Sequence, residues 1–270
     1  VDTYKTNKRI KNKKQKTKNK KIIMTITIKY SIGDGGVEYK NFNKIRQLPN
    51  YDRIVYIDCC NNKLTSLPSK LPESLQELHC YNNDLTSLPS NLPESLQTLD
   101  CSYNDLTSLP SKLPESLRGL DCCSNDLTSL PSTLPESLQT LDCSYNDLTS
   151  LPSKLPESLQ ILNCSNNNLT SLPSSLPESL IGLYCSDNDI TSLPSSLPAS
   201  LQTLYCSYNK LTELPSKLPE SLKILNCRNN NLTSLPINLH ELRNITYCIY
   251  YTNEIEYIPP QTTRFLNRLK

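Results

Sequence analysis

The sequence predicts a single elongated solenoid, in which short coils of the chain stack side by side and share one core. Three observations predict it. The sequence repeats with a period of 21 residues, and each unit contains a short segment of alternating inward and outward residues followed by a proline-rich return path. A unit of this length can bury its apolar side chains only against neighbouring units, which is typical of a solenoid. Ten of the twelve cysteines mark the period, at Cys59, Cys80, Cys101, Cys122, Cys143, Cys164, Cys185, Cys206, Cys227 and Cys248.

The alternating segment of each unit predicts a strand. In the unit around residue 100, Leu99 and Cys101 alternate with Thr98, Asp100 and Ser102. Successive side chains of a strand point to opposite faces, so the first two are predicted to point inward and the other three outward. Because every unit repeats this segment in register, we expect a parallel β-sheet along the concave face of the solenoid.

An asparagine follows each predicted strand, at the point where the chain must turn away from the sheet. In the same unit it is Asn104. Its amide can satisfy backbone groups of its own turn and of a neighbouring coil. We therefore predict a ladder of asparagine hydrogen bonds along the solenoid.

The return path of each unit contains two prolines, such as Pro110 and Pro114. Proline removes a backbone donor and favours extended angles in the residue before it, which excludes an α-helix there. The predicted convex face is therefore irregular or polyproline-like, with little or no α-helix in the fold.

The repeats divide the chain into four segments. Residues 1–23 form a basic tail, for which we expect disorder, and residues 24–49 an N-terminal cap with a predicted strand at 25–30 and a partial repeat. Nine well-formed repeats occupy residues 50–238. Residues 239–270 form a degenerate repeat and a C-terminal cap, with two inserted residues expected between Tyr247 and Asn253.

The cysteines favour free thiols and an intracellular protein. Neighbouring parallel strands lie about 4.8 Å apart, wider than the ~3.8 Å between the Cβ atoms of a disulfide. No segment has the ~20 apolar residues of a membrane-spanning helix, and none resembles a secretory signal. We therefore expect the cytoplasm, or the host-cell cytoplasm for a viral protein. Met24 comes just before the segment for which we expect order, and we therefore hypothesise that translation starts at Met24.

The repeat L-x-x-L-x-C-x-x-N-x-L over residues 43–259 resembles the leucine-rich repeat, with cysteine in place of one leucine. The LPxxLPxSL return resembles the short repeats of bacterial effectors. The cysteine-bearing variant is similar to repeat proteins of amoebae and of the giant DNA viruses that infect them. This resemblance implies a non-catalytic scaffold that binds other proteins on its sheet face, with a host-interaction role for a viral or amoebal protein.

The outward sheet positions vary from repeat to repeat, so they are the candidate binding residues. The first half of the face is acidic, while the second half carries tyrosines and isoleucines, and tyrosine is frequent in binding hot spots. The pattern predicts a protein partner with a basic segment and an apolar one, bound by a monomer. The alternative is a solvated face that diversified after duplication. The candidates are Asp58, His79, Asp100, Asp121, Asp142, Ile161, Tyr184, Tyr205 and Ile224.

Two other functions stay open from the sequence. Residues 1–21 hold nine lysines and Arg9 against Asp2, hence a charge of +9, which could tether the chain to nucleic acid or an anionic surface, or be a solvated tail. Cys60 and His79 are predicted on adjacent strands and could form a metal or thiol site, whereas Cys123 is about 14 Å away. We expect no enzyme activity and no cofactor, because no Gly-rich phosphate loop or oxyanion donor is evident.

Overall fold

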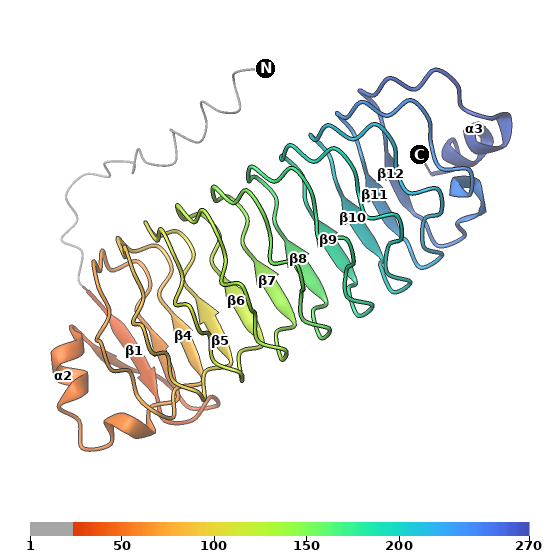
Figure 1. Ribbon diagram of the computed structural model, residues 1–270. Helices are drawn as coiled ribbons and strands as arrows, with labels where there is room; N and C mark the ends of the chain where they lie inside the picture. The colour runs from red at the N-terminus through yellow and green to blue at the C-terminus, as the bar shows by residue number, and fades with distance from the viewer. Residues whose placement is uncertain (1–23, 270) are drawn as a thin grey trace, which may run out of the picture.

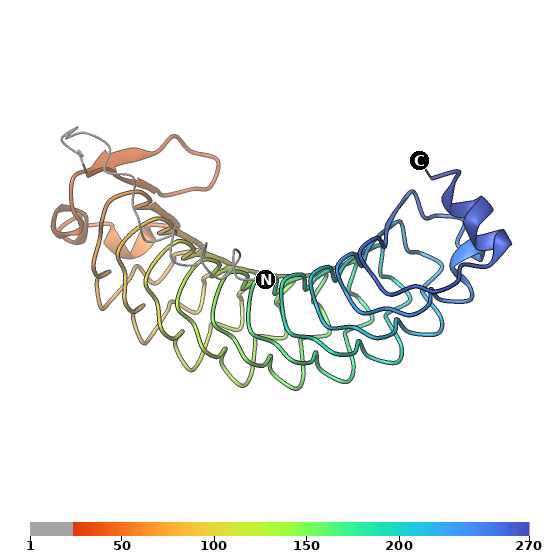
Figure 2. The same ribbon diagram turned by 90° about the horizontal axis from the view of Figure 1, so that it is seen from above.

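The computed structural model describes residues 24–269, and its coils stack into a curved arc (Figures 1 and 2). One twelve-stranded sheet runs the length of the arc in the order β12-β11-β10-β9-β8-β7-β6-β5-β4-β3-β1-β2. The sheet lines the inner, concave side, and the proline-containing returns form the convex side (Figure 2).

Each repeat contributes one strand of three residues, and all of these strands are parallel and in register. Leu99 of one strand pairs with Leu120 of the next, and the same leucine column continues along the sheet. These observations confirm the predicted solenoid with a parallel sheet and very little helix. The repeat strands are β3 (Tyr56–Asp58), β4 (Glu77–His79), β5 (Thr98–Asp100), β6 (Gly119–Asp121), β7 (Thr140–Asp142), β8 (Ile161–Asn163), β9 (Gly182–Tyr184), β10 (Thr203–Tyr205) and β11 (Ile224–Asn226).

The core consists of the inward leucines and the cysteine that follows each strand. Leu99, Cys101 and Leu106 have no exposed surface, and equivalent residues of the other repeats extend the same core along the arc. Burying one leucine contributes roughly 1.5–3 kcal/mol relative to exposure, so stacked repeats stabilise one another. The Cys101 thiol lies 3.4 Å from the Asp121 carbonyl and donates to it. Cysteine therefore acts here as a small apolar residue with a weak donor.

The asparagine ladder is present as predicted. Nδ2 of Asn104 donates to the carbonyl oxygens of Cys80 at 3.0 Å and Cys101 at 3.1 Å. Its Oδ1 accepts from the amide of Leu85 at 3.0 Å. Each ladder asparagine thus joins its own turn to the preceding repeat and satisfies backbone groups that are buried between coils.

A second ladder, of serines, was not predicted from the sequence. The Ser116 hydroxyl lies 2.6 Å from the Glu94 carbonyl oxygen and 2.7 Å from that of Leu96. One hydroxyl hydrogen is shared between these two acceptors of the preceding repeat. The adjacent proline closes a turn, because the Leu117 amide donates to the Pro114 carbonyl. This is a structural reason for the recurring Pro-Glu-Ser-Leu sequence.

The turn after each strand departs from the sequence prediction in one respect. Ser102 was expected to point outward, but it is only 4% exposed, and its hydroxyl donates to Oδ1 of Asp100 at 2.7 Å. The next residue, Tyr103, has a φ of 52°, and the same position in the other repeats is also left-handed. This turn draws the chain under the end of the strand, which buries the serine.

The N-terminal cap is a hairpin and a short helix. Strands β1 (Ile26–Lys29) and β2 (Val37–Tyr39) pair antiparallel, and β1 also pairs antiparallel with β3. Helix α2 (Phe42–Arg46) begins after Asn41, whose Oδ1 accepts from the Lys44 amide. A 3₁₀ turn at Tyr51–Arg53 precedes the strand of the first repeat. Helix α2 thus occupies the first part of the segment for which a partial repeat was predicted, with Ile45 buried in the core.

The C-terminal repeat is shifted relative to the sequence prediction. Strand β12 (Tyr247–Ile249) pairs with β11 so that Cys248 lies opposite Leu225 and occupies the leucine position. The two inserted residues therefore precede the strand, near the 3₁₀ turn at Leu239–Glu241, rather than following it. Helix α3 (Pro260–Leu266) packs against that turn and closes the core.

No helix within residues 24–269 is long and apolar enough to span a membrane. The basic segment 1–21, with the nucleic-acid or anionic-surface binding predicted for it, lies outside the described residues.

Candidate functional site

The concave face carries two columns of outward side chains, one at the first and one at the third position of each strand. The third-position column places Asp100, Asp121 and Asp142 side by side on β5, β6 and β7. It continues through Asn163 on β8 to the tyrosines of β9 and β10. The sheet register therefore brings seven of the nine sequence-predicted candidates into one row, whereas Ile161 and Ile224 lie in the first-position column.

The three aspartates line one side of a hollow of about 220 Å³, which we name the acidic hollow. It lies over Gly119, and a Cβ atom at that position would lie 3.3 Å from Thr140 Oγ1 and 3.9 Å from Thr98 Cγ2. The missing side chain of a single glycine thus opens the floor of the sheet. Its lining consists of Thr98, Leu99, Asp100, Gly119, Leu120, Asp121, Thr140, Leu141, Asp142, Ile161 and Asn163.

One oxygen of each carboxylate is held by the turn that follows its strand. The amides of Ser102, Cys123 and Ser144 donate to Oδ1 of Asp100, Asp121 and Asp142 at 3.1, 3.0 and 2.9 Å. Oδ2 of Asp142 accepts in addition from Asn163 Nδ2 at 2.9 Å. These bonds fix the carboxylates in place beside one another.

The electrostatics of the acidic hollow favour a positively charged ligand. Burial raises the pKa of Asp121, the Cys123 amide lowers it, and the Asp142 and Asp100 carboxylates raise it again. Within residues 24–269, no lysine, arginine or histidine forms an ion pair with these three aspartates. An incoming cation would relieve the mutual repulsion of these carboxylates.

An apolar surface adjoins the acidic hollow on β8 to β10. We name it the aromatic platform and define it as Ile161, Gly182, Tyr184 and Tyr205. The two tyrosine rings are stacked, with centroids 5.4 Å apart and planes 20° apart. Ile161 belongs to both surfaces, because it also lines the acidic hollow. Ile224, the last apolar candidate, follows in the same column on β11.

The first two candidates lie at the N-terminal end of the face and make local contacts. Oδ1 of Asp58 accepts from the Cys60 amide at 3.0 Å. Nε2 of His79 lies 3.5 Å from Oε2 of Glu77, and its ring centroid lies 5.4 Å from that of Tyr56. His79 therefore borders the acidic row without joining the hollow.

The described residues bring three potential metal ligands together at a place other than Cys60 and His79. The ligand atoms of Asp121, Cys123 and Asp142 lie within 4.8 Å of one another. Burial, together with the charge of Asp121, raises the pKa of the Cys123 thiol to about 12, which opposes the thiolate that a metal requires. Burial and a hydrogen bond to Asp58 likewise raise the pKa of Cys60. Both thiols are protonated near neutral pH.

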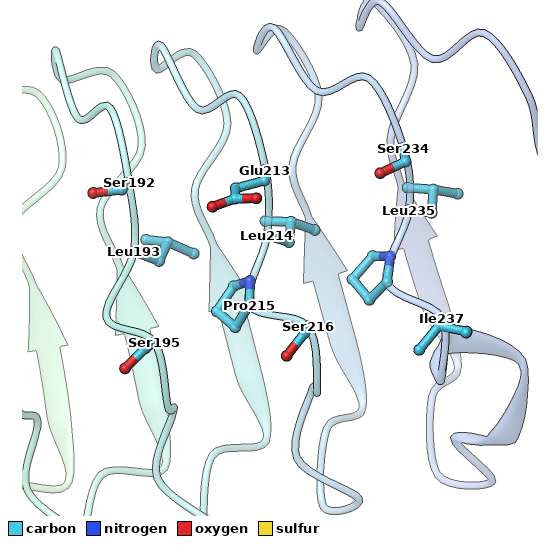
Figure 3. A pocket seen from close by; sticks show the side chains of 11 residues that line it. Ser192, Leu193, Ser195, Glu213, Leu214, Pro215, Ser216, Ser234, Leu235 and Ile237 are labelled. Carbon is cyan, nitrogen blue, oxygen red and sulfur yellow. The ribbon is translucent and has the colours of Figure 1, made fainter.

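A larger hollow of about 500 Å³ lies on the opposite, convex side, with the strands behind it (Figure 3). It is lined by equivalent residues of successive repeats, such as Leu193, Leu214 and Leu235. Another hollow, of about 450 Å³, is lined by different repeat positions between residues 69 and 94, such as Leu71 and Leu92. Ile237 is the distinctive residue of the larger hollow, since it is 79% exposed where the preceding repeats have serine.

Sequence reasoning missed the two glycines of the concave face as site residues. Gly119 opens the acidic hollow, and Gly182 lies beneath the aromatic platform. Both occupy the first strand position, where other repeats have threonine, isoleucine, tyrosine or glutamate. Aligning the repeats by column would have revealed this signal.

Comparisons with known proteins agree with this architecture. The leucine-rich-repeat family model matches residues 95–115, 137–157, 158–180 and 200–220. YopM, a leucine-rich effector protein from Yersinia pestis, is 33% identical over 74% of this chain and 68% of its own, with a TM-score of 0.61. The functional domain of InlJ from Listeria monocytogenes, which includes a cysteine ladder, is 27% identical over 76% of this chain and 55% of its own, with a TM-score of 0.57.

A structure of the Toll–Spatzle complex, described as a molecular hub in Drosophila development and innate immunity, matches with a TM-score of 0.60. It is 25% identical over 71% of this chain and 29% of its own. No curated protein sequence matches the chain. The identity to YopM, the family model and the repeat architecture agree, and the chain belongs to the leucine-rich repeat family.

Proposed function

We propose that this protein is a non-catalytic scaffold that binds a protein partner on its concave face. The observation that carries the proposal is the contrast between the two sides of each strand. The inward leucine and cysteine are the same in nearly every repeat, whereas the outward residues change from aspartate to tyrosine along the arc. A rigid sheet whose outward side chains differ from repeat to repeat is suited to recognising another protein.

The relatives support a binding role rather than a catalytic one. Leucine-rich repeat proteins generally act as interaction scaffolds, and one similar structure is the Toll–Spatzle complex. YopM is described as an effector. By this analogy we propose that the chain acts on a protein of a host cell and does so inside that cell, as a monomer.

The charge of the face supports a partner with a basic segment. The acidic hollow concentrates three carboxylates on this face. Charge complementarity of this kind accelerates association and selects among partners. The aromatic platform would then bind an apolar part of the same partner.

Affinity capture from cells, followed by mass spectrometry, tests this proposal. The wild-type chain is compared with the double variant Tyr184→Ala, Tyr205→Ala, and the convex substitution Ile237→Ala is the matched apolar control. We expect the platform variant to lose the partner and the control to retain it. Equal capture by both variants would refute the assignment to the concave face.

A charge series provides a second test of the same face. Reversal of Asp100, Asp121 and Asp142 to lysine is compared with reversal of Glu94, Glu115 and Glu136, which are exposed in the turns outside the sheet. Both variants change the net charge equally, so a loss of capture in the first alone would indicate a local effect of the face.

A further inference from the structure

We propose that the concave face binds an extended segment that runs along the solenoid axis and presents two anchors. A lysine or arginine side chain enters the acidic hollow, and an apolar or aromatic side chain, about four to six residues away, lies on the aromatic platform. This inference rests on the proposed function and specifies the chemistry and spacing of the partner.

The acidic hollow fits a single long cationic side chain. Its floor at Gly119 is free of a side chain, and its volume is about 220 Å³. Threonines of the flanking strands border the floor, while the three carboxylates stand in a row beside it. An ammonium or guanidinium group can therefore contact carboxylate oxygens while its stem lies over Gly119.

The aromatic platform fits a flat or branched apolar side chain. A Cβ atom on Gly182 would lie 3.0 Å from Ile161 Cδ1 and 3.1 Å from Tyr184 Cε2. The glycine therefore allows both side chains to lie low over the sheet. Tyr184 stacks on Tyr205, and together they offer a broad, preorganised ring surface. Little side-chain entropy is lost when a partner binds to rings that are already packed.

The sheet spacing sets the distance between the two anchors. Asp121 lies on β6, and the tyrosines lie three and four strands away on β9 and β10. At about 4.8 Å per strand, the separations are roughly 14 and 19 Å. An extended chain advances about 3.3 Å per residue, so about four to six residues connect the anchors. Ile161 lies between them and keeps the surface continuous.

The two glycines are therefore specificity-determining positions. Threonine occupies the same column on β5, β7 and β10, so it is compatible with the sheet at this position. Gly119→Thr would place a side chain on the floor of the hollow without altering any carboxylate, and the Thr140 hydroxyl, 3.3 Å from the new Cβ atom, would shift slightly. This substitution gives a matched variant whose folding can be verified separately from its binding.

Selection of random peptides on the immobilised full-length chain tests the proposal. We expect enriched peptides to carry lysine or arginine and, four to six residues away, an aromatic or large apolar residue. Synthetic versions of these peptides are then titrated against the wild type, Gly119→Thr and the platform variant Tyr184→Ala, Tyr205→Ala. Each variant should weaken binding by about tenfold or more, with an unchanged circular dichroism spectrum and melting temperature.

The outcomes separate this inference from the proposed function. If the platform variant loses the peptides and Gly119→Thr binds them like the wild type, the hollow is not an anchor and this inference fails while concave-face binding stands. If neither substitution changes binding, both fail. Enrichment of peptides without a basic residue, or with no preferred spacing, would also overturn the two-anchor inference. This includes an outcome in which the chain's own basic residues 1–21 fill the hollow and no basic peptide is selected.

Discussion

Removing one asparagine from the ladder should destabilise the whole solenoid, and Asn146 is the most informative choice because it is central and only 1% exposed. Its Oδ1 accepts from the Leu127 amide at 3.0 Å. Its Nδ2 donates to the carbonyls of Cys122 at 3.0 Å and Cys143 at 3.1 Å. These two carbonyls also accept from the neighbouring ladder residues Asn125 and Asn167.

The substitution Asn146→Ala therefore deprives the Leu127 amide of its acceptor and removes one of two donors from each carbonyl. A buried, unsatisfied amide costs about 1–3 kcal/mol, and each lost shared bond costs about 0.5 kcal/mol or more. We expect the free energy of unfolding to fall by about 2–4 kcal/mol, measured by urea denaturation followed by circular dichroism. Asn168→Ala, in an exposed turn of the next repeat, should change it by less than about 0.5 kcal/mol.

The variant Asn146→Asp tests the donor role separately. A carboxylate would face the same carbonyl oxygens, so protonation of its side chain would be favoured in the folded state. A raised folded pKa gives stability that is present at low pH and lost as the pH rises. The defect relative to wild type should therefore be larger at pH 7 than at pH 4. A loss of under about 0.5 kcal/mol for Asn146→Ala would refute the ladder argument.

Three further predictions concern the thiols and the turns. Burial raises the pKa of nine core cysteines, for example Cys185 to about 12, while unfolded thiols titrate near 8.5. The free energy of unfolding should therefore be unaffected by the thiols below about pH 8.5 and fall above it, by on the order of 1 kcal/mol per thiol and pH unit. Circular dichroism should show steep alkaline unfolding, and a stability that stays constant up to about pH 11 would contradict this. Tyr103 has a φ of 52°, so Tyr103→Gly should raise the free energy of unfolding by about 0.5–1 kcal/mol and Tyr103→Val should lower it by about 1–2 kcal/mol. The opposite order in urea denaturation would be inconsistent with the left-handed turn. Removing the nearby charge with Asp121→Asn should lower the pKa of Cys123 and accelerate its alkylation at pH 8 several-fold, as measured by mass spectrometry; an unchanged rate would argue against the charge coupling.

Most of the fold could be predicted because the same pattern of core, strand and turn residues recurs in each repeat. Leu99 and Cys101 alternate with outward residues that are polar in most copies, and Asn104 recurs at the turn, so the strand and its ladder follow from the pattern. The shift of the last repeat did not follow, because Cys248 keeps the cysteine spacing while pairing as a leucine. Counting a period cannot distinguish these two registers when the inserted residues lie between strands.

The candidate site was predicted less completely than the fold. The column that contains Asp121 and Tyr184 follows from alternation and register alone. The acidic hollow was not predicted from the sequence, because it depends on the absence of a side chain at Gly119 and on the small threonines beside it. Ser102 was misplaced because the left-handed residue after it, a tyrosine, has no sequence signature for that conformation.

Carboxylate footprinting of the chain with its captured partner tests the central claim, that the concave face is the binding surface. Each of several repeats offers an aspartate on this face and a glutamate in an exposed turn, such as Asp142 and Glu136, so one experiment contains its own control. We expect the partner to protect Asp100, Asp121 and Asp142 from carbodiimide labelling and to leave the labelling of Glu94, Glu115 and Glu136 unchanged. Protection of the glutamates with the aspartates still labelled would contradict it.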